Sequence, residues 1–239
     1  EARVQSLGQL PALKPFSTTR KCSAPWLQRH TEQIRNASAL LSRLGERARP
    51  VAFTGDSITE GIVRVGFSER GANSTRQPRN EEIWKSFFPG PILNFGVGGD
   101  RVQDLGWRLQ HGILSLDFSP SAVVVAIGTN DLGSGEDPDV VVDEIKELVE
   151  LIYATKRAPV VLSAILPRGA DEGTRGSDSF HRSAWWHTLW NPYRASIERV
   201  NAALHSFEGP SRAWLTVVDC GDLFVHDAYS PESQVDLGA

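Results

Sequence analysis

The sequence predicts an α/β domain built on a parallel sheet of five strands, with helices covering both faces. Short apolar runs alternate along the chain with segments whose apolar residues recur at helical spacing. Three of the apolar runs end in polar motifs that contain glycine, at residues 55–58, 94–100 and 128–131. Ligands of parallel sheets bind beyond the carboxyl ends of the strands. The 239 residues, 40% of them hydrophobic, suffice for one sizeable core, and no second domain is predicted.

The expected elements follow one another in regular order. Strands are predicted at 51–54, 92–95, 121–127, 160–166 and 214–219, and helices at 31–47, 81–88, 101–111, 137–157 and 192–207. The first of these helices ends near Gly45, a residue type that commonly follows a helix. Asp137-Pro138 marks the start of the helix at 137–157, because proline is favoured in the first turn after a capping side chain.

The first motif, Gly55-Asp56-Ser57-Ile58, follows the apolar run 51–54. A serine at the point where a buried strand turns sharply is held at the rim of the sheet, where a nucleophile is useful. Taken alone, such a motif is more often a plain helix N-cap. The two later motifs favour the nucleophile.

The second and third motifs supply hydrogen-bond donors. Asn94-Phe95-Gly96-Val97-Gly98-Gly99-Asp100 has three glycines in four positions, so backbone N–H groups are left uncovered by side chains. The alternative is a tight turn capped by Asp100. Gly128-Thr129-Asn130-Asp131 places the amide of Asn130 at the same rim, with an Asx-turn as the alternative. A hydroxyl, a backbone donor and an amide donor together are the parts of an acyl-transfer site.

These motifs resemble the first three blocks of the SGNH (GDSL-type) hydrolase family. The resemblance implies a three-layer, flavodoxin-like sandwich and a serine esterase. By the same resemblance, Ser57 is the nucleophile, and the N–H of Ser57, the N–H of Gly99 and the side chain of Asn130 hold the oxyanion. Asp56 and Asp100 are supporting residues. Neither a metal nor an organic cofactor is implied.

The likeness extends to one subgroup of that family, which includes the α subunits of intracellular platelet-activating-factor acetylhydrolase. It covers roughly residues 26–227 and is carried by Trp26-Leu27-Gln28-Arg29-His30, Glu82-Ile83-Trp84, Trp107-Arg108-Leu109 and Ile165-Leu166-Pro167-Arg168-Gly169. The expected substrate is a small acyl ester, with acetyl as one choice. Lysophospholipase and thioesterase activity are alternatives. Because the subgroup includes dimers, a homodimer is a further expectation.

The family's fourth block, an Asp-x-x-His motif after the last strand, is not found after residue 219. His226, His187 and His181 are the remaining candidates for the base. The chain contains no methionine, which favours a fragment that ends before this motif. The rival interpretation is a non-catalytic binding protein of the same fold that has lost its base. The segment 170–195, rich in Trp and His, is either a lid over the site or a cover for the sheet edge.

Residues 1–25 are polar and basic, and we expect a flexible arm before a single domain at 26–239 that is incomplete at its C-terminus. The net charge of −4 gives no electrostatic case for nucleic acid as a partner. No apolar run approaches the length of about 20 residues that spans a bilayer. A soluble protein is predicted, with a cytoplasmic or organellar compartment favoured over secretion. Cys22 and Cys220 are read as free thiols or as a pair.

Overall fold

A computed structural model describes residues 15–62, 86–88, 90–168 and 192–224. Its five strands all run parallel and lie in the order β2-β1-β3-β4-β5. The strands are β1 Val51–Gly55, β2 Ile92–Gly96, β3 Ala122–Ala126, β4 Val160–Ser163 and β5 Leu215–Val218. This order is that of the flavodoxin-like sheet. The predicted α/β class and all five predicted strands are confirmed.

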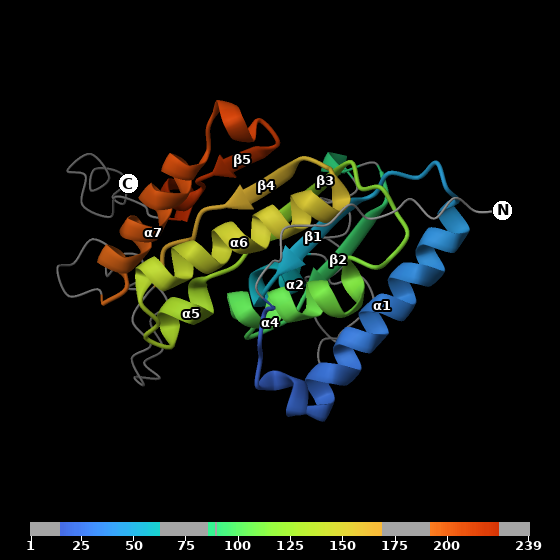
Figure 1. Ribbon diagram of the computed structural model, residues 1–239, viewed down its shortest axis with the longest axis horizontal. Helices are drawn as coiled ribbons and strands as arrows, with labels where there is room; N and C mark the ends of the chain where they lie inside the picture. Colours follow the sequence, from blue (N-terminus) through green and yellow to red (C-terminus); the bar gives the residue numbers. More distant parts are fainter. Residues whose placement is uncertain (1–14, 63–85, 89, 169–191, 225–239) are drawn as a thin grey trace, which may run out of the picture.

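Helices flank the sheet (Figure 1). They are α1 Ala24–Leu44, α2 Ser57–Ile62, α4 Val102–Arg108, α5 Thr129–Gly133, α6 Pro138–Lys156 and α7 Arg194–Phe207. The connections from β2 to β3, β3 to β4 and β4 to β5 all advance across the sheet in one direction. Because such crossovers are right-handed, α4, α6 and α7 lie side by side on one face. Helix α1 packs along the β2 edge.

The core lies between the sheet and this helical layer. Helix α6 buries a stripe at helical spacing, made of Val141, Ile145, Leu148, Val149 and Ile152. Its start is as predicted, with the Asp137 side chain accepting a hydrogen bond from the N–H of Asp139 and Pro138 in the first turn. Helix α4 ends earlier than predicted and continues as a π-helix, Leu109–Ile113, in which Gly112 has a φ of +139° and packs against Ile34.

The N-terminal segment departs from the expected flexible arm over its described part. Residues 1–14 lie outside the described residues, but Phe16 is only 5% exposed. Its ring covers Gly106 in α4, where an added Cβ would lie 2.2 Å from the ring. Thr18 is also buried and donates a hydrogen bond to Asp104. The packed domain therefore includes residues 16–25, because an aromatic side chain and a glycine far apart in sequence fit together.

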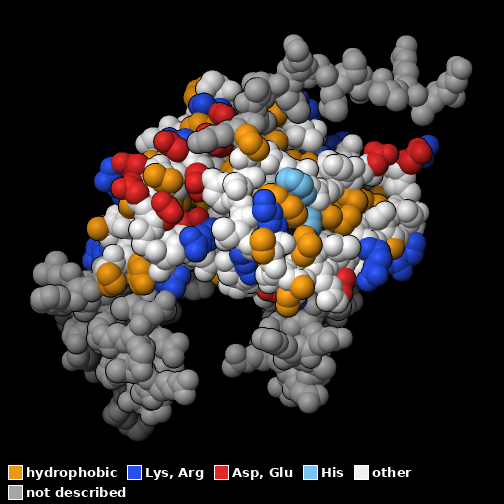
Figure 2. Space-filling view, turned by 60° about the horizontal axis from the view of Figure 1, so that its bottom comes forward, with side chains coloured by type: hydrophobic (Ala, Val, Ile, Leu, Met, Phe, Trp, Pro, Cys, Tyr) orange, Lys and Arg blue, Asp and Glu red, His pale blue; other side chains and the backbone are white. Residues whose placement is uncertain are grey.

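The surface carries charges of both signs. On the face seen in Figure 2, basic and acidic side chains are interspersed, and no wide area has one sign of charge. Among the helices of the described residues, none is both long enough and apolar enough to span a bilayer.

Candidate active site

Ser57 lies at the carboxyl end of β1, as predicted, and is the first residue of the short helix α2. Its side chain is exposed, whereas the preceding Asp56 is 1% exposed. Gly55 permits this tight change of direction because an added Cβ would lie 2.1 Å from the carbonyl oxygen of Ala126. The strand end thus buries the acidic neighbour and presents the serine hydroxyl to solvent.

The glycine-rich turn after β2 lies directly beside Ser57. An added Cβ on Gly98 would lie 3.7 Å from the Cβ of Ser57. An added Cβ on Gly96 would lie 2.3 Å from the backbone nitrogen of Glu60, so glycine is what allows α2 to approach β2. Gly99 has a φ of +76°, which side chains disfavour. Within the described residues, the N–H groups of Ser57 and Gly99 donate to no acceptor.

Asn130, which follows β3, lies beside the glycine turn that follows β2. Its Nδ2 donates a hydrogen bond of 2.9 Å to the backbone oxygen of Asp100, at the end of the glycine turn. An amide nitrogen carries two donors, so this contact orients the group and leaves one hydrogen for a further acceptor. Because β1 and β3 flank the point where the strand order reverses, Ser57 and Asn130 lie where ligands of this fold bind.

Asp100 anchors the turn from beneath through its fully buried carboxylate. Oδ1 accepts from Arg20 Nη1 at 2.6 Å and from Trp26 Nε1 at 2.8 Å. Oδ2 accepts from Arg108 Nε at 2.7 Å and lies 2.7 Å from Arg108 Nη2. Burial raises the pKa of Asp100, and these donors oppose the shift. The expected alternative of a helix cap is not what this side chain does, since Arg101 occupies the N-cap of α4.

Arg108, also fully buried, links the ends of β1 and β2. Its Nη1 donates to the carbonyl of Phe95 at 2.8 Å, and its Nη2 donates to that of Gly55 at 3.4 Å. Gln33 in α1 completes this arrangement by accepting from Arg108 Nη1 and donating to the carbonyl of Gly96. The strand ends that carry the candidate site are therefore held by buried polar side chains from α1 and α4.

Two buried acids of the motifs have pKa values above the usual range. Burial raises the pKa of Asp56 to about 6, although the hydrogen bond from the N–H of Ile58 opposes the shift. Burial likewise raises the pKa of Asp131 to about 7, and the N–H of Val102, which lies 3.1 and 3.3 Å from its two oxygens, opposes it. Because Asp56 is buried under the turn, it supports the strand end and does not project beside the Ser57 hydroxyl.

The raised pKa of Asp131 predicts a pH dependence of stability. Between the ordinary pKa of 3.8 and about 7, the folded state binds more protons at this carboxyl than the unfolded state. The free energy of unfolding should therefore fall as the pH rises through this window. Asp131→Asn keeps the acceptor for Val102 and should flatten that decline. Urea unfolding at a series of pH values from 4 to 8 measures the free energy of unfolding of both proteins. If it falls equally steeply with pH in wild type and in Asp131→Asn, the raised pKa of Asp131 is contradicted.

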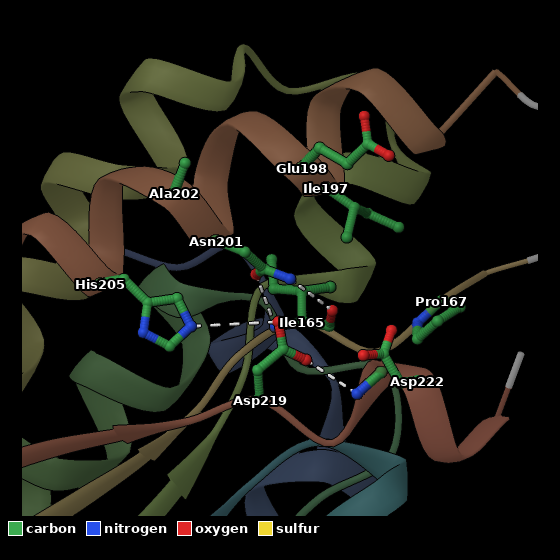
Figure 3. A pocket seen from close by; sticks show the side chains of 10 residues that line it. Ile165, Pro167, Ile197, Glu198, Asn201, Ala202, His205, Asp219 and Asp222 are labelled. Atoms are coloured by element: carbon green, nitrogen blue, oxygen red, sulfur yellow. Dashed lines mark hydrogen bonds and ion pairs between the residues drawn. The ribbon is translucent and has the colours of Figure 1, made fainter.

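A separate pocket lies between α7 and the ends of β4 and β5 (Figure 3). Its volume is about 290 Å³, and its lining includes His205, Asp219 and Asp222. His205 Nε2 lies 3.9 Å from Asp219 Oδ2, and Asp219 Oδ1 accepts from the N–H of Gly221. None of the lining residues belongs to the three motifs, so this pocket is distinct from the surroundings of Ser57.

The structure thus brings together Ser57, Gly99, Asn130, Asp56 and Asp100 at one edge of the sheet. The three base candidates, His226, His187 and His181, lie outside the described residues, as do most of the predicted helix 81–88 and most of the segment 170–195. The sequence reasoning missed Arg20 as a contact of the turn. Arg29 and Arg108 belong to the motifs that carry the family resemblance. Arg108 is buried in the same helix turn as Leu105 and next to Leu109, and this position is the signal that could have identified it as a supporting residue.

Comparison with known proteins agrees with the geometry. The profile of the GDSL-like lipase/acylhydrolase family matches residues 53–236. The chain is similar to the platelet-activating factor acetylhydrolase IB subunit alpha1 of Homo sapiens, with 42% identity over 61% of this chain and 54% of the relative. It is 31% identical to subunit alpha2 of Rattus norvegicus, over 84% of this chain and 69% of that relative. The matched part therefore spans little more than half of the alpha1 subunit.

The fold is also found among solved structures. A GDSL-like lipase from Bacteroides thetaiotaomicron superposes with a TM-score of 0.53 at 20% identity, over 80% of this chain and 78% of the other. At this identity the likeness concerns the fold alone.

Proposed function

Because the chain belongs to the GDSL-like lipase/acylhydrolase family, we propose that it is a serine esterase that cleaves a small acyl ester through an acyl-enzyme on Ser57. One observation carries the proposal: an exposed serine hydroxyl shares the sheet edge with two backbone N–H groups that have no described acceptor and with an oriented amide. Preorganised neutral donors of this kind stabilise the charge that develops on a carbonyl oxygen in acyl transfer.

The reaction proceeds in two displacements. Ser57 Oγ attacks the ester carbon while a base takes its proton, and the electron pair of the carbonyl moves to oxygen. The N–H groups of Ser57 and Gly99 and the Nδ2 of Asn130 hold that oxyanion. The carbon–oxygen bond to the alcohol then breaks, and the alcohol leaves with the proton. Water repeats the sequence on the acyl-enzyme and releases the acid and Ser57. We propose the base among His226, His187 and His181.

The acyl group is proposed to be acetyl. The relatives that share 31–42% identity are named as acetylhydrolase subunits. A second candidate is a binding protein that holds an acylated ligand in the same place without turnover. It differs from the esterase in having no base within reach of the Ser57 hydroxyl. A serine without a base is a poor nucleophile.

Trapping the intermediate tests the esterase proposal. The chain is mixed with p-nitrophenyl acetate, quenched in acid and digested, and the peptides are examined by mass spectrometry. We expect the mass of one acetyl group on the peptide that carries Ser57, and its absence from that peptide in Ser57→Ala. Acetyl groups on lysines alone, or equally on both proteins, would contradict the acyl-enzyme and favour the binding protein.

A further inference from the structure

The peptide that joins Gly98 to Gly99 contains a carbonyl that accepts a hydrogen bond and an N–H that donates to no acceptor among the described residues. Arg20 Nη2 donates a hydrogen bond of 3.1 Å to the carbonyl oxygen of Gly98. The N–H on the other side of the same peptide belongs to Gly99. A peptide is planar, and in its trans form the C=O and N–H point in opposite directions. A group that fixes the carbonyl therefore also fixes the direction of the N–H.

We propose that Arg20 is a positioning residue of the oxyanion hole, acting on the Gly99 N–H through the carbonyl of Gly98. The inference rests on the proposed function, because it concerns a donor of that reaction. Among the described residues, no hydrogen bond or ion pair joins Arg20 to Ser57, and the contacts of Arg20 with this site are made to the glycine turn itself. In this role Arg20 fixes the direction of the donor and takes no part in the bond changes.

Arg20 is itself held by several contacts. Its Nη1 pairs with Asp100 Oδ1 at 2.6 Å, so the two ends of one guanidinium contact the carboxylate and the carbonyl of the same turn. Its Cζ lies 5.6 Å from the centre of the Trp26 ring. Its backbone N–H donates to Thr18 Oγ1 at 2.9 Å. The planar fork of arginine suits this double contact, which a lysine ammonium cannot reproduce with the same geometry.

The charge of Arg20 contributes as well as its position. A hydrogen bond from a cation to a peptide carbonyl is stronger than a neutral one and polarises that peptide. The Gly99 N–H thereby becomes a better donor to a developing oxyanion. The preceding peptide is fixed from the other side, since the N–H of Gly98 donates to Glu60 Oε2 at 2.8 Å. Glu60 forms an ion pair with Arg29 of α1. Both peptides of the glycine turn are thus oriented by charged side chains.

Steady-state hydrolysis of p-nitrophenyl acetate by the whole chain tests the role of Arg20. Removing an entire oxyanion donor typically costs about 10²–10³ in rate, so loss of its alignment in Arg20→Ala should lower kcat by about 10-fold to 10²-fold with KM little changed. Guanidinium ion at concentrations below those that unfold the protein should restore part of kcat. The kcat of Arg20→Lys should lie between those of wild type and Arg20→Ala, because lysine keeps the charge without the planar fork of arginine.

Arg212→Ala is the matched control. Arg212 is 34% exposed, close to the 32% of Arg20, and also pairs with a carboxylate and an aromatic ring. It precedes β5 and so lies toward the opposite end of the strands from Ser57. We expect its kcat to be unchanged and guanidinium to have no effect. An unchanged kcat in Arg20→Ala, or a loss that guanidinium does not restore, would overturn the role of Arg20.

A second readout needs no turnover. In amide proton–nitrogen correlation spectra, the Gly99 resonance should shift in Arg20→Ala, move back on addition of guanidinium and stay in place in Arg212→Ala. Ser57→Ala is measured alongside in the kinetic assay. Hydrolysis that is equal in wild type and Ser57→Ala overturns the proposed function and, with it, the catalytic role of Arg20. Ser57-dependent hydrolysis that is insensitive to Arg20 overturns this inference alone.

Discussion

Replacing Ser57 by alanine is expected to lower the rate of p-nitrophenyl acetate hydrolysis by at least about 10⁴-fold, since a serine hydrolase that loses its nucleophile can lose about 10⁶-fold in kcat. The variant removes only the hydroxyl. The oxyanion donors stay in place, because the N–H of residue 57, the Gly99 turn and the Asn130 contact do not depend on that side chain. Any residual rate then measures the donors and substrate binding alone.

The fold should not change in this variant. Ser57 is exposed, and the hydrogen bond that caps this turn comes from Asp56 Oδ1, which accepts from the N–H of Ile58. Equal melting temperatures of wild type and Ser57→Ala would show that the substitution leaves the fold unchanged. A loss of similar size in one of His226→Gln, His187→Gln and His181→Gln would identify the base. Equal hydrolysis rates with and without the serine hydroxyl would contradict the esterase assignment.

Arg108→Ala is expected to destabilise the protein by about 3–5 kcal/mol, the usual result when one partner of a buried ion pair is removed. Both Arg108 and Asp100 are 0% exposed, and their side chains lie 2.7 Å apart. In this variant, the hydrogen-bond donors that remain to the Asp100 carboxylate among the described residues are Arg20 and Trp26. The substitution also removes the donor to the carbonyl of Phe95, which is then buried without this partner. Urea unfolding measured by tryptophan fluorescence gives the difference in the free energy of unfolding.

The comparison is again Arg212→Ala, whose exposed ion pair with Glu150 should contribute no more than about 0–1 kcal/mol. The double variant Arg108→Met with Asp100→Leu removes both charges together and should recover much of the loss, because no charge is then left buried alone. If Arg108→Ala unfolds at the same urea concentration as wild type, the pair does not hold the strand ends as described.

The sequence was sufficient for those features that depend on neighbours along the chain. The apolar runs predicted all five strands, and the position of a motif directly after a strand placed Ser57 and Asn130 at one edge. The parallel sheet then follows, because strands separated by helices pair in this way. The catalytic roles of these residues stay predictions, as does the homodimer.

The supporting contacts could not be predicted, because they join residues far apart in sequence. Arg20 and Asp100 are 80 positions apart, and Trp26 and Asp100 are 74 apart. Local pattern favoured an N-cap for Asp100 and a loose arm for Arg20, since a polar side chain near a turn or a terminus is commonly solvated. One signal was present: a charged residue on the apolar side of a helix, as Arg108 is, requires a buried partner.

The packing of Phe16 on Gly106 has a practical consequence for any shortened form of this protein. A fragment that began at Trp26 would retain the sheet, the nucleophile and all but the first two residues of α1. It would lack the segment that carries Arg20 to the glycine turn and the ring that covers α4. Such a fragment would fold with Ser57 in place and still hydrolyse esters slowly. The low rate would be caused by the absence of the Arg20 guanidinium from the glycine turn, and it would be mistaken for the lack of a base.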